Sequence, residues 1–490
     1  MTRELVIGLD IGTTSAKAVA FDVGGRLITE AETMIETYHP VLGWAEQNPK
    51  EVEEAATTAL GDAIKKLNAK EDHILAIGLS CAMHSLVCVD EHYEPLSPML
   101  LWSDTRASGV AEQLNRGYGK KIYQKTGTPI HPMTPLTKLI WMKENQYSAY
   151  IDAAYFMTMK EYLIAKWFDE RVTDYAMASS TGLLNLHSLT WDSEALQLAG
   201  IHKEQLSVLT TPKKVFLNID PQVADRVGLP KRTPFVLGAA DGQLANLGSG
   251  AISPGEVNIS VGTSGAIRQF VQGAPVHEKM DTFTYAFTED MSIIGGPTNN
   301  GGIVLQWLKD MLEFEGSHDE LTALAEHVDV GAEGLLFHPY INGERAPLWN
   351  GRARGNFYGL TIQHRKEHLV RAVLEGIALN IYQIGKSLEN IAGKPKKITV
   401  NGGLSKSDIW VQMLADLFGQ NIYLSDTHHN VAWGAAWAAL VGIGRVHSFE
   451  EVKGSLPREK VVTWSPFNHE KYMAVYQKYE KLANGLEEYF

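Results

Sequence analysis

The residues nearest the N-terminus that could perform chemistry form a short polar turn between two hydrophobic runs. The turn contains Asp10, Gly12, Thr13, Thr14, Ser15 and Lys17. Its glycine lets a ligand approach the backbone, and its N–H groups, hydroxyls and ammonium group can bind phosphate oxygens. Asp10 is an anion, so its useful role beside a phosphate would be to hold a hydrated Mg²⁺. The pattern predicts a phosphate site at the tip of a β-hairpin, although small polar residues also suit an ordinary turn.

A second turn of the same kind lies about half a chain length further on. An alternating run over residues 256–261 leads into Gly262 and Thr263, and another apolar run follows. Internal repetition of a supersecondary unit is a signature of duplicated architecture. Two copies of one phosphate hairpin predict two lobes with a nucleotide clamped between them.

One carboxylate stands out between the two turns. A hydrophobic run from residue 236 ends in small residues around Asp241, and Gly242 follows it. Small neighbours would let a substrate hydroxyl come close, so Asp241 is the best candidate for a general base. An aspartate before glycine is otherwise most often a turn former.

Two further segments could bind a polyhydroxylated substrate. The first contains Met83 and His84, and the second contains Trp102, Asp104 and Arg106. These residue types supply hydrogen-bond partners for hydroxyl groups, an aromatic wall, and a guanidinium for a carboxylate. The structural alternatives are a hydrogen-bonded histidine at His84 and core packing at Trp102. Asp104 and Arg106 could equally form a surface pair in a turn.

Two glycine pairs suggest a place for a nucleoside. Gly302 opens a predicted helix that carries Gln306, and Gly403 lies between a predicted strand and Ser407, where a helix over 408–418 begins. Glycine leaves room for a flat ring, and a helix N-terminus favours phosphate oxygens. A nucleobase and ribose could therefore lie between these two helix starts.

Periodicity predicts the elements that position these residues. The first hairpin is followed by a strand near 27–33, a helix over 49–70 and a buried strand over 74–80. This order is typical of an α/β lobe with a mixed sheet, whose ligands gather at the strand ends. An amphipathic helix over 469–489 is expected to pack as a brace.

The chain of 490 residues is too long for a single core. We expect an N-terminal lobe over 1–247 with the sugar site and the base, and a C-terminal lobe over 248–450 with the nucleotide site. The remaining residues, 451–490, are expected to form a tail with a packing helix.

Charge and cysteine use argue against several partners. The 44 Lys and Arg residues against 57 Asp and Glu give a formal charge of −13, which disfavours nucleic acids and anionic membranes. Cys81 and Cys88 are the only cysteines and lack metal-site spacing, which favours a reduced, cytoplasmic compartment. The most apolar stretch, residues 431–442, is too short to span a bilayer, and the N-terminus carries no targeting pattern.

Longer motifs resemble those of the FGGY carbohydrate kinases, within the wider group of actin, heat-shock chaperones and sugar kinases. The motifs are Met133-Thr-Pro135-Leu-Thr-Lys138-Leu-Ile-Trp141, Gly355-Asn-Phe-Tyr-Gly359-Leu360 followed by His368-Leu-Val-Arg-Ala372, and the turns around Asp10, Asp241, Gly262 and Gly402. The likeness extends over nearly the whole chain.

The resemblance implies two RNase H-like α/β lobes with mixed sheets and a central cleft that closes to exclude water. Asp241 would deprotonate a primary hydroxyl for in-line attack on the γ-phosphate of ATP, and Asp10 would support Mg²⁺ through water. It also implies phosphate contacts from Thr13, Thr14, Ser15 and Thr263, and an adenosine pocket formed by Gly302, Gln306, Gly403 and Ser407.

The resemblance narrows the substrate as well. The Met83-His84 pair is similar to the pair that contacts the sugar in xylulose kinases, whereas residues 238–242 and 343–355 are most similar to gluconate kinases. We therefore expect phosphorylation of D-gluconate at its terminal hydroxyl, with Arg106 as the cation for its carboxylate. The alternatives are a ketose kinase and a nucleotide-binding regulator or filament protein without transfer activity. A homodimer is expected by analogy alone.

Overall fold

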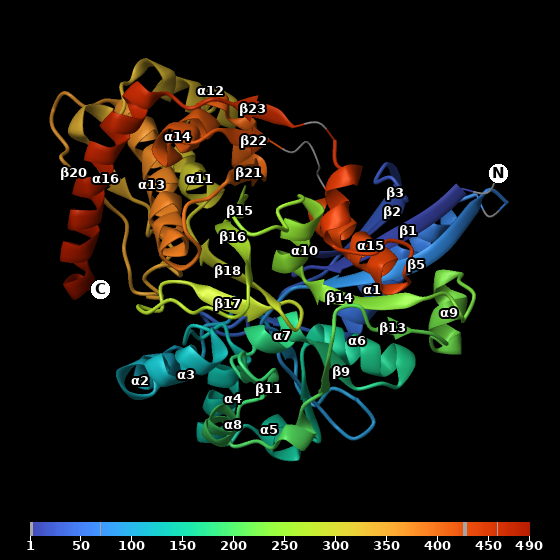
Figure 1. Ribbon diagram of the computed structural model, residues 1–490. Coiled ribbons are helices and arrows are strands. Elements are labelled where there is room, and N and C mark those ends of the chain that lie inside the picture. The colour runs from blue at the N-terminus through green and yellow to red at the C-terminus, as the bar shows by residue number, and fades with distance from the viewer. Residues whose placement is uncertain (1–2, 69, 425–428, 458) are drawn as a thin grey trace.

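The computed structural model describes residues 3–68, 70–424, 429–457 and 459–490, which fold into two α/β lobes (Figure 1). The first lobe is built on a six-stranded sheet and the second on a seven-stranded sheet. Both sheets combine antiparallel and parallel pairs. The predicted fold class, two α/β lobes with mixed sheets, is confirmed.

The first sheet has the strand order β13-β14-β5-β1-β2-β3. Its strands are β1 (Arg3–Ile11), β2 (Ser15–Asp22), β3 (Leu27–Met34), β5 (Asp72–Cys81), β13 (Val215–Phe216) and β14 (Phe235–Ala240). β1 and β2 are antiparallel with Asp10 opposite Lys17, so the polar turn forms the tip of the predicted hairpin. β1 and β5 are parallel with Asp10 beside Ser80, so their carboxyl ends meet at one edge of the sheet.

The second sheet has the order β17-β18-β16-β15-β21-β22-β23. Its strands are β15 (Glu256–Val261), β16 (Gly265–Gln272), β17 (Phe283–Ala286), β18 (Met291–Thr298), β21 (Lys397–Asn401), β22 (Ile422–Leu424) and β23 (Lys460–Val462). The five strands β18-β16-β15-β21-β22 repeat the arrangement β3-β2-β1-β5-β14, an antiparallel meander followed by two parallel strands. The repetition predicted from the two polar turns is present in the fold.

Helices pack around both sheets, and a helical region lies below the first sheet in the view of Figure 1. In the first lobe these are α1 (Pro49–Lys65), α2 (Ser108–Gly117), α3 (Gly119–Thr126), α4 (Pro135–Glu144), α5 (Ser148–Asp152), α6 (Met159–Phe168), α7 (Tyr175–Ser180), α8 (Ser193–Ala199), α9 (Pro221–Val227) and α10 (Asp241–Gly248). In the rest of the chain they are α11 (Gly302–Met311), α12 (His318–Ala323), α13 (Lys366–Ala392), α14 (Asp408–Phe418), α15 (Asn430–Gly442) and α16 (Pro466–Leu486).

Capping residues set the start of α1. The Asn48 side chain accepts from the backbone N–H of Lys50, and Pro49 occupies the first turn, where a missing N–H has no cost. The helix ends at Lys65 and therefore stops short of the predicted end at residue 70. By contrast, α14 has the predicted bounds.

Short strands connect these elements outside the two large sheets. They are β4 (Glu46–Gln47), β6 (Val87–Val89), β7 (Met99–Leu100), β8 (Tyr155–Met157), β9 (Val172–Asp174), β10 (Leu184–Asn185), β11 (Thr190–Trp191), β12 (Val208–Thr210), β19 (Leu336–His338) and β20 (Asn356–Tyr358). Among them, β4 pairs with β7, which brings the segment before α1 against the segment that leads to Trp102.

Helix α15 lies within the 248–450 range expected for the second lobe, yet it packs on β1 and β5 of the first sheet and on α10. Glycines allow this close approach: a Cβ atom on Gly78 would lie 1.8 Å from the carbonyl oxygen of Ala435, and one on Gly434 would lie 2.1 Å from that of Leu244. β23, from the expected tail, pairs with β22 as a strand of the second sheet.

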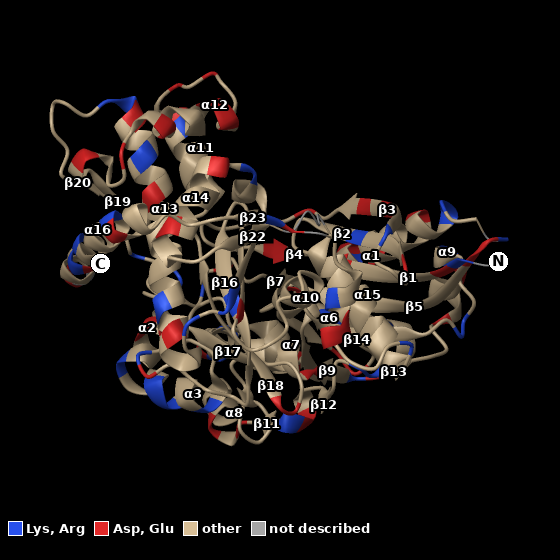
Figure 2. Ribbon diagram, turned by 45° about the horizontal axis from the view of Figure 1, so that its top comes forward, with Lys and Arg blue, Asp and Glu red and all other residues tan. Residues whose placement is uncertain are grey.

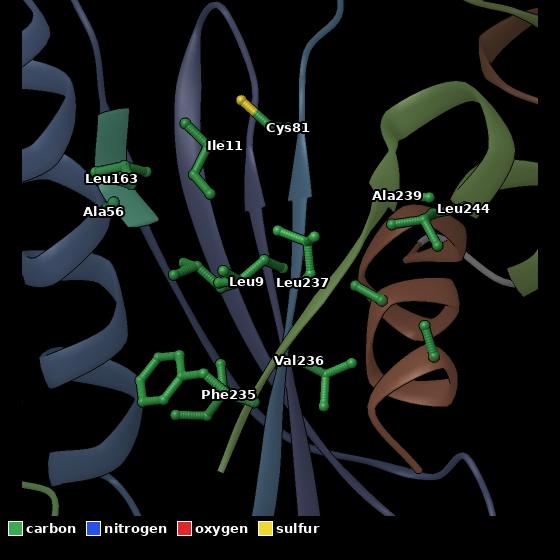
Figure 3. Close-up of a cluster of buried hydrophobic side chains, with 14 of the residues drawn as sticks. Leu9, Ile11, Ala56, Cys81, Leu163, Phe235, Val236, Leu237, Ala239 and Leu244 are labelled. Atoms are coloured by element: carbon green, nitrogen blue, oxygen red, sulfur yellow. The ribbon is translucent and has the colours of Figure 1, made fainter. Parts of the chain in front are cut away.

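The first lobe has a continuous hydrophobic core on both faces of its sheet. Figure 3 shows Leu9 of β1 with Phe235 and Leu237 of β14, between Ala56 of α1 and Leu244 of α10. All five side chains are buried. Burial of a leucine or phenylalanine stabilises a fold by about 1.5–3 kcal/mol, so this core holds firmly the strand ends that carry the polar residues.

The surface charges, the two cysteine thiols and the helix lengths bear on the expectations drawn from composition. Acidic and basic residues are mixed along the helices of both lobes (Figure 2). Burial raises the pKa of the Cys81 and Cys88 thiols, which keeps them protonated. In the part of the chain that the structure describes, no helix has the length and apolar character needed to cross a membrane.

Candidate active site

The polar edges of the two sheets enclose a cavity of about 1010 Å³. The first lobe contributes all six residues of its polar turn: Asp10, Gly12, Thr13, Thr14, Ser15 and Lys17. The second lobe contributes Ser260 at the end of β15 and the segment after β21, including Gly403. A ligand in this cavity would therefore contact both lobes at once.

The first turn is closed by a hydrogen bond of 3.0 Å from the backbone N–H of Gly12 to the carbonyl oxygen of Ser15. The Ser15 hydroxyl donates to Glu32 of β3 at 2.6 Å, and the Lys17 ammonium lies 3.5 Å from the same carboxylate. A phosphate at this turn would therefore compete with Glu32 for both side chains.

The second turn is hydrogen-bonded to the start of α11. The backbone N–H of Gly302 donates to the carbonyl of Gly262 at 2.7 Å. A Cβ atom on Gly301 would lie 2.7 Å from the carbonyl oxygen of Ser264, so glycine is needed for this approach. An adjoining cavity of about 440 Å³ is lined by Gly262, Thr263, Gly302, Gln306, Gly403 and Ser407. The residues implied for the adenosine pocket thus lie together around one space.

Two acidic residues, Asp10 and Asp241, lie close enough to influence each other. Burial raises the pKa of Asp10 to about 6, and the negative charge of Asp241 adds to this effect. The Ser80 hydroxyl donates to Asp10 at 2.8 Å and opposes the rise. Burial also raises the pKa of Asp241, against the effect of the nearby Arg268 cation. A pair of carboxylates in such a site favours a bound cation or a proton.

A third cavity, of about 370 Å³, contains the predicted base and several predicted substrate residues. Its lining includes Met83, His84, Trp102 and Asp241, together with Thr13 and Thr263 from the two polar turns. The structure therefore brings the candidate base, most of the candidate substrate residues and both phosphate turns to one place. We call this cavity the acceptor pocket.

His84 is held in a fixed orientation in the acceptor pocket. Its backbone φ is 66°, in the left-handed region, and its Nδ1–H donates to the carbonyl oxygen of Ser180 at 2.7 Å. Burial lowers the pKa of His84 to about 3, so the ring is neutral and its Nε2 can accept a hydrogen bond. The structural and the substrate-binding interpretations of His84 are thus compatible.

Asp104 and Arg106 do not line the acceptor pocket, which corrects the prediction of their position. The Arg106 guanidinium donates to Asp104 at 2.8 Å and to Glu46 at 2.6 Å, and its Cζ lies 3.7 Å from the centroid of the Trp44 ring. The Asp104 carboxylate also accepts from the backbone N–H of Ala45 at 2.8 Å. The two residues form a buried ion-pair cluster that joins the segments before α1 and before α2.

The acceptor pocket contains polar residues to which the sequence assigned no role of their own, although one of them, Arg345, lies in the gluconate-kinase-like segment 343–355. They are Arg268 of β16, Tyr285 of β17 and Arg345, in the loop after β19. The Arg345 guanidinium lies 5.0 Å from the centroid of the Trp102 ring and donates to the carbonyl oxygen of Thr298 at 3.2 Å. Arg268 is the only charged residue of β16, and that is the signal that could have drawn attention to this position.

Comparison with known families and structures agrees with this arrangement. The N-terminal domain of the FGGY family of carbohydrate kinases matches residues 5–248, and the C-terminal domain of that family matches residues 257–443. The chain belongs to the FGGY family of carbohydrate kinases. It is therefore a phosphotransferase that acts on an alcohol group, and sugar kinases of this family use ATP as the phosphate donor.

Individual members of the family cover nearly the whole chain. The gluconokinase of Bacillus subtilis is 39% identical over 500 residues, with 98% of this chain and 96% of that protein covered. Crystal structures of a gluconate kinase and of a ligand-bound xylulose kinase, both from Lactobacillus acidophilus, superpose with TM-scores of 0.96 at 34% identity. Each superposition covers 99% of this chain. The superpositions cover 99% of the gluconate kinase chain and 98% of the xylulose kinase chain. Overall shape therefore does not separate the two substrates.

Proposed function

We propose that this kinase transfers the γ-phosphoryl group of ATP to the terminal hydroxyl of D-gluconate, giving 6-phosphogluconate and ADP. The observation that carries the proposal is the composition of the acceptor pocket, which combines one candidate base, Asp241, with two arginines. Excess positive charge, within a chain whose net charge is −13, favours an anionic substrate over a neutral sugar. The gluconokinase relative supports the same substrate.

In the proposed reaction Asp241 is the general base. It accepts the proton of the terminal hydroxyl while the hydroxyl oxygen forms a bond to the γ-phosphorus of ATP. The bond between that phosphorus and the β–γ bridging oxygen breaks, and ADP leaves with the bridging oxygen. The raised pKa of Asp241 makes it a better proton acceptor than an exposed carboxylate would be.

Residues of both lobes would position the two substrates. In this proposal Gly12, Thr13, Thr14 and Ser15 offer donors to the phosphates from the first lobe, with Lys17 as a cation, while Gly262 and Thr263 do so from the second. Gly302, Gln306, Gly403 and Ser407 surround the adenosine. Met83, His84 and Trp102 bind the sugar acid. Transfer then depends mainly on position and charge, as is usual for phosphoryl transfer.

Mg²⁺ fits this site as an ion held jointly by protein and nucleotide. Among the described residues no group of three His, Cys, Asp or Glu side chains could hold a metal by itself. Asp10 lines the cavity of about 1010 Å³ between the two lobes. Its pKa is raised because the buried carboxylate has, in the described part of the chain, no cation near enough to offset burial and the charge of Asp241. Mg²⁺ commonly takes one carboxylate, several waters and phosphate oxygens, and it neutralises charge on the phosphates.

Two alternatives remain open to test. A neutral ketose such as D-xylulose would use the same base and nucleotide site, and the xylulose kinase structure of equal TM-score favours it. A nucleotide-binding regulator or filament protein would need no base in the acceptor pocket, so the placement of Asp241 speaks against it. A cytoplasmic location stays a prediction of the sequence, and a homodimer stays an expectation by analogy.

The test is ADP release by the purified protein with Mg-ATP and one of five additions: D-gluconate, D-xylulose, L-ribulose, glycerol or no sugar. We expect the highest kcat/KM with D-gluconate. A higher value with either ketose would refute gluconate as the substrate while leaving the base and the nucleotide site in place. ATP turnover that no sugar accelerates would favour the binding protein instead.

A further inference from the structure

Three buried polar atoms, on residues that line the acceptor pocket, have no hydrogen-bond partner among the described residues. They are the Nε atoms of Arg268 and Arg345 and the hydroxyl oxygen of Tyr285. Leaving a buried polar group unpaired costs about 1–3 kcal/mol, and more for a charged group. All three donors belong to residues that line one cavity, so a ligand there that accepts hydrogen bonds would supply the missing partners after small side-chain shifts.

Strand register brings two of these residues to one face of the second sheet. Arg268 of β16 and Phe283 of β17 both pair with Gly295 of β18, and Tyr285 lies two residues beyond Phe283. A Cβ atom on Gly295 would lie 2.7 Å from the Phe283 ring and 3.0 Å from Cγ of Arg268, so the glycine makes room for both. The Phe283 and Tyr285 rings stack with centroids 4.3 Å apart, which fixes the tyrosine.

Arg345 reaches the same space from the loop after β19. Its guanidinium and that of Arg268 repel each other. Burial raises the pKa of the Tyr285 hydroxyl and both guanidinium groups oppose this rise, so the hydroxyl stays protonated and can donate a hydrogen bond. Burial lowers the pKa of Arg345 to about 10, against the effect of the Glu344 charge. Burial also lowers the pKa of Arg268, against the effect of the Asp241 charge. Both side chains nevertheless stay charged at neutral pH. A ligand that carries a negative charge would relieve this repulsion.

We propose that Arg268, Arg345 and Tyr285 form a carboxylate subsite that selects sugar acids over neutral sugars. The assignment rests on the proposed function, because it needs a substrate with a carboxylate at one end and the reacting hydroxyl at the other. Guanidinium groups suit carboxylates in charge and in donor geometry. Arg268 also lies near Asp241, so the subsite and the base belong to one continuous pocket.

The test compares D-gluconate with D-glucitol, which keeps the six-carbon chain and a terminal hydroxyl but has no carboxylate. The variants are Arg268→Met, Arg345→Met and Tyr285→Phe, with Arg232→Met as the control at an exposed arginine. The quantity measured is the ratio of kcat/KM for the two substrates. We expect each arginine variant to lower this ratio about 10- to 100-fold and Tyr285→Phe to lower it about tenfold. Arg232→Met should keep it.

The outcomes separate the subsite from the proposed function. If wild-type protein uses gluconate but Arg268→Met and Tyr285→Phe keep the wild-type ratio, the subsite is refuted and the function stands. An equal loss of kcat/KM with D-gluconate and D-glucitol would also refute the subsite, because the residues would then act on the phosphoryl group or on the fold. If wild-type protein uses a ketose and leaves gluconate unused, the function and the subsite fail together.

Discussion

The ammonium group of Lys138 donates to the carbonyl oxygens of His84 and Leu101, both at 2.7 Å. The lysine side chain is buried, and burial lowers its pKa to about 7. The two carbonyls belong to the segments that present His84 and Trp102 to the acceptor pocket. Lys138 is therefore a positioning residue that joins two parts of the substrate site without lining the pocket itself.

Substituting Lys138 should weaken sugar binding selectively. In Lys138→Met both carbonyls lose their donor, so we expect the KM for the sugar substrate to rise about 10- to 100-fold and the KM for ATP to stay within about twofold. Lys143→Met is the matched control, because Lys143 lies on the same helix and is exposed. A general effect on folding would raise both KM values or lower the yield of active enzyme, and that result would contradict a positioning role.

Replacing Asp241 should remove catalysis and spare nucleotide binding. Asp241→Asn keeps the size of the side chain but cannot accept a proton, so we expect kcat to fall about 10²- to 10⁴-fold. ATP affinity, measured by calorimetry, should stay within about twofold. Asp225→Asn on α9 is the control, since that carboxylate is exposed. Turnover like that of the wild type in Asp241→Asn would exclude this residue as the base.

Asp10 should make the protein less stable as the pH rises. Its pKa is about 6 in the folded state against 3.8 as the reference value, so the folded state holds the proton more tightly. Folding stability is therefore lost between pH 4 and pH 6, by about 3 kcal/mol for this difference. Asp10→Asn does not titrate in this range. The variant should match the wild type near pH 4 and be more stable by about that amount above pH 6.

The measurement for Asp10 is urea unfolding between pH 4 and pH 8 with a chelator and without nucleotide. Asp62→Asn, at a half-exposed carboxylate of α1, should show no such trend. The Asp10→Asn variant should also lose kinase activity, because the amide cannot support a cation at the phosphates as a carboxylate does. A stability difference that stays constant from pH 4 to pH 8 would contradict the raised pKa.

Local patterns in the sequence were sufficient to predict the position of those parts of the candidate site that are formed by consecutive residues. The turns at residues 12–15 and 262–265 each connect adjacent strands, so their place in the fold is visible in a few consecutive residues, while their phosphate-binding role stays a prediction. Asp241 was also identifiable, because it directly follows the buried strand β14. Five strands of each sheet share one order, which agrees with the repetition of the two turns.

Long-range contacts account for what the sequence did not reveal. Arg106 was interpreted as a carboxylate ligand, but its partner Glu46 is 60 residues away and occupies its guanidinium. Arg268 and Arg345 are 77 positions apart, and only the fold brings them to one pocket. The position of α15 on the first sheet depends on backbone contacts at glycines, which periodicity does not report. Contacts between residues that are far apart in the sequence cannot be predicted from the composition of a short segment.

The contact between α15 and the first sheet should be intolerant of a single methyl group. A Cβ atom on Gly78 of β5 would lie 1.8 Å from the backbone oxygen of Ala435, so Gly78→Ala must push α15 away from the sheet. We expect a loss of more than about 4 kcal/mol in unfolding free energy, or no soluble protein. Surviving enzyme should turn over slowly, because α15 packs on α10, whose first residue is Asp241.

Gly109→Ala in α2 is the control for this substitution. A Cβ atom there meets no atom within 4 Å, and alanine favours a helix over glycine by up to about 1 kcal/mol, so this variant should be slightly more stable. Thermal and urea unfolding of both variants would measure the difference. The change in unfolding free energy should have opposite signs in Gly78→Ala and Gly109→Ala. The added methyl group meets a backbone oxygen at the first site and open space at the second. A Tm for Gly78→Ala equal to that of the wild type would show that α15 does not need this close approach.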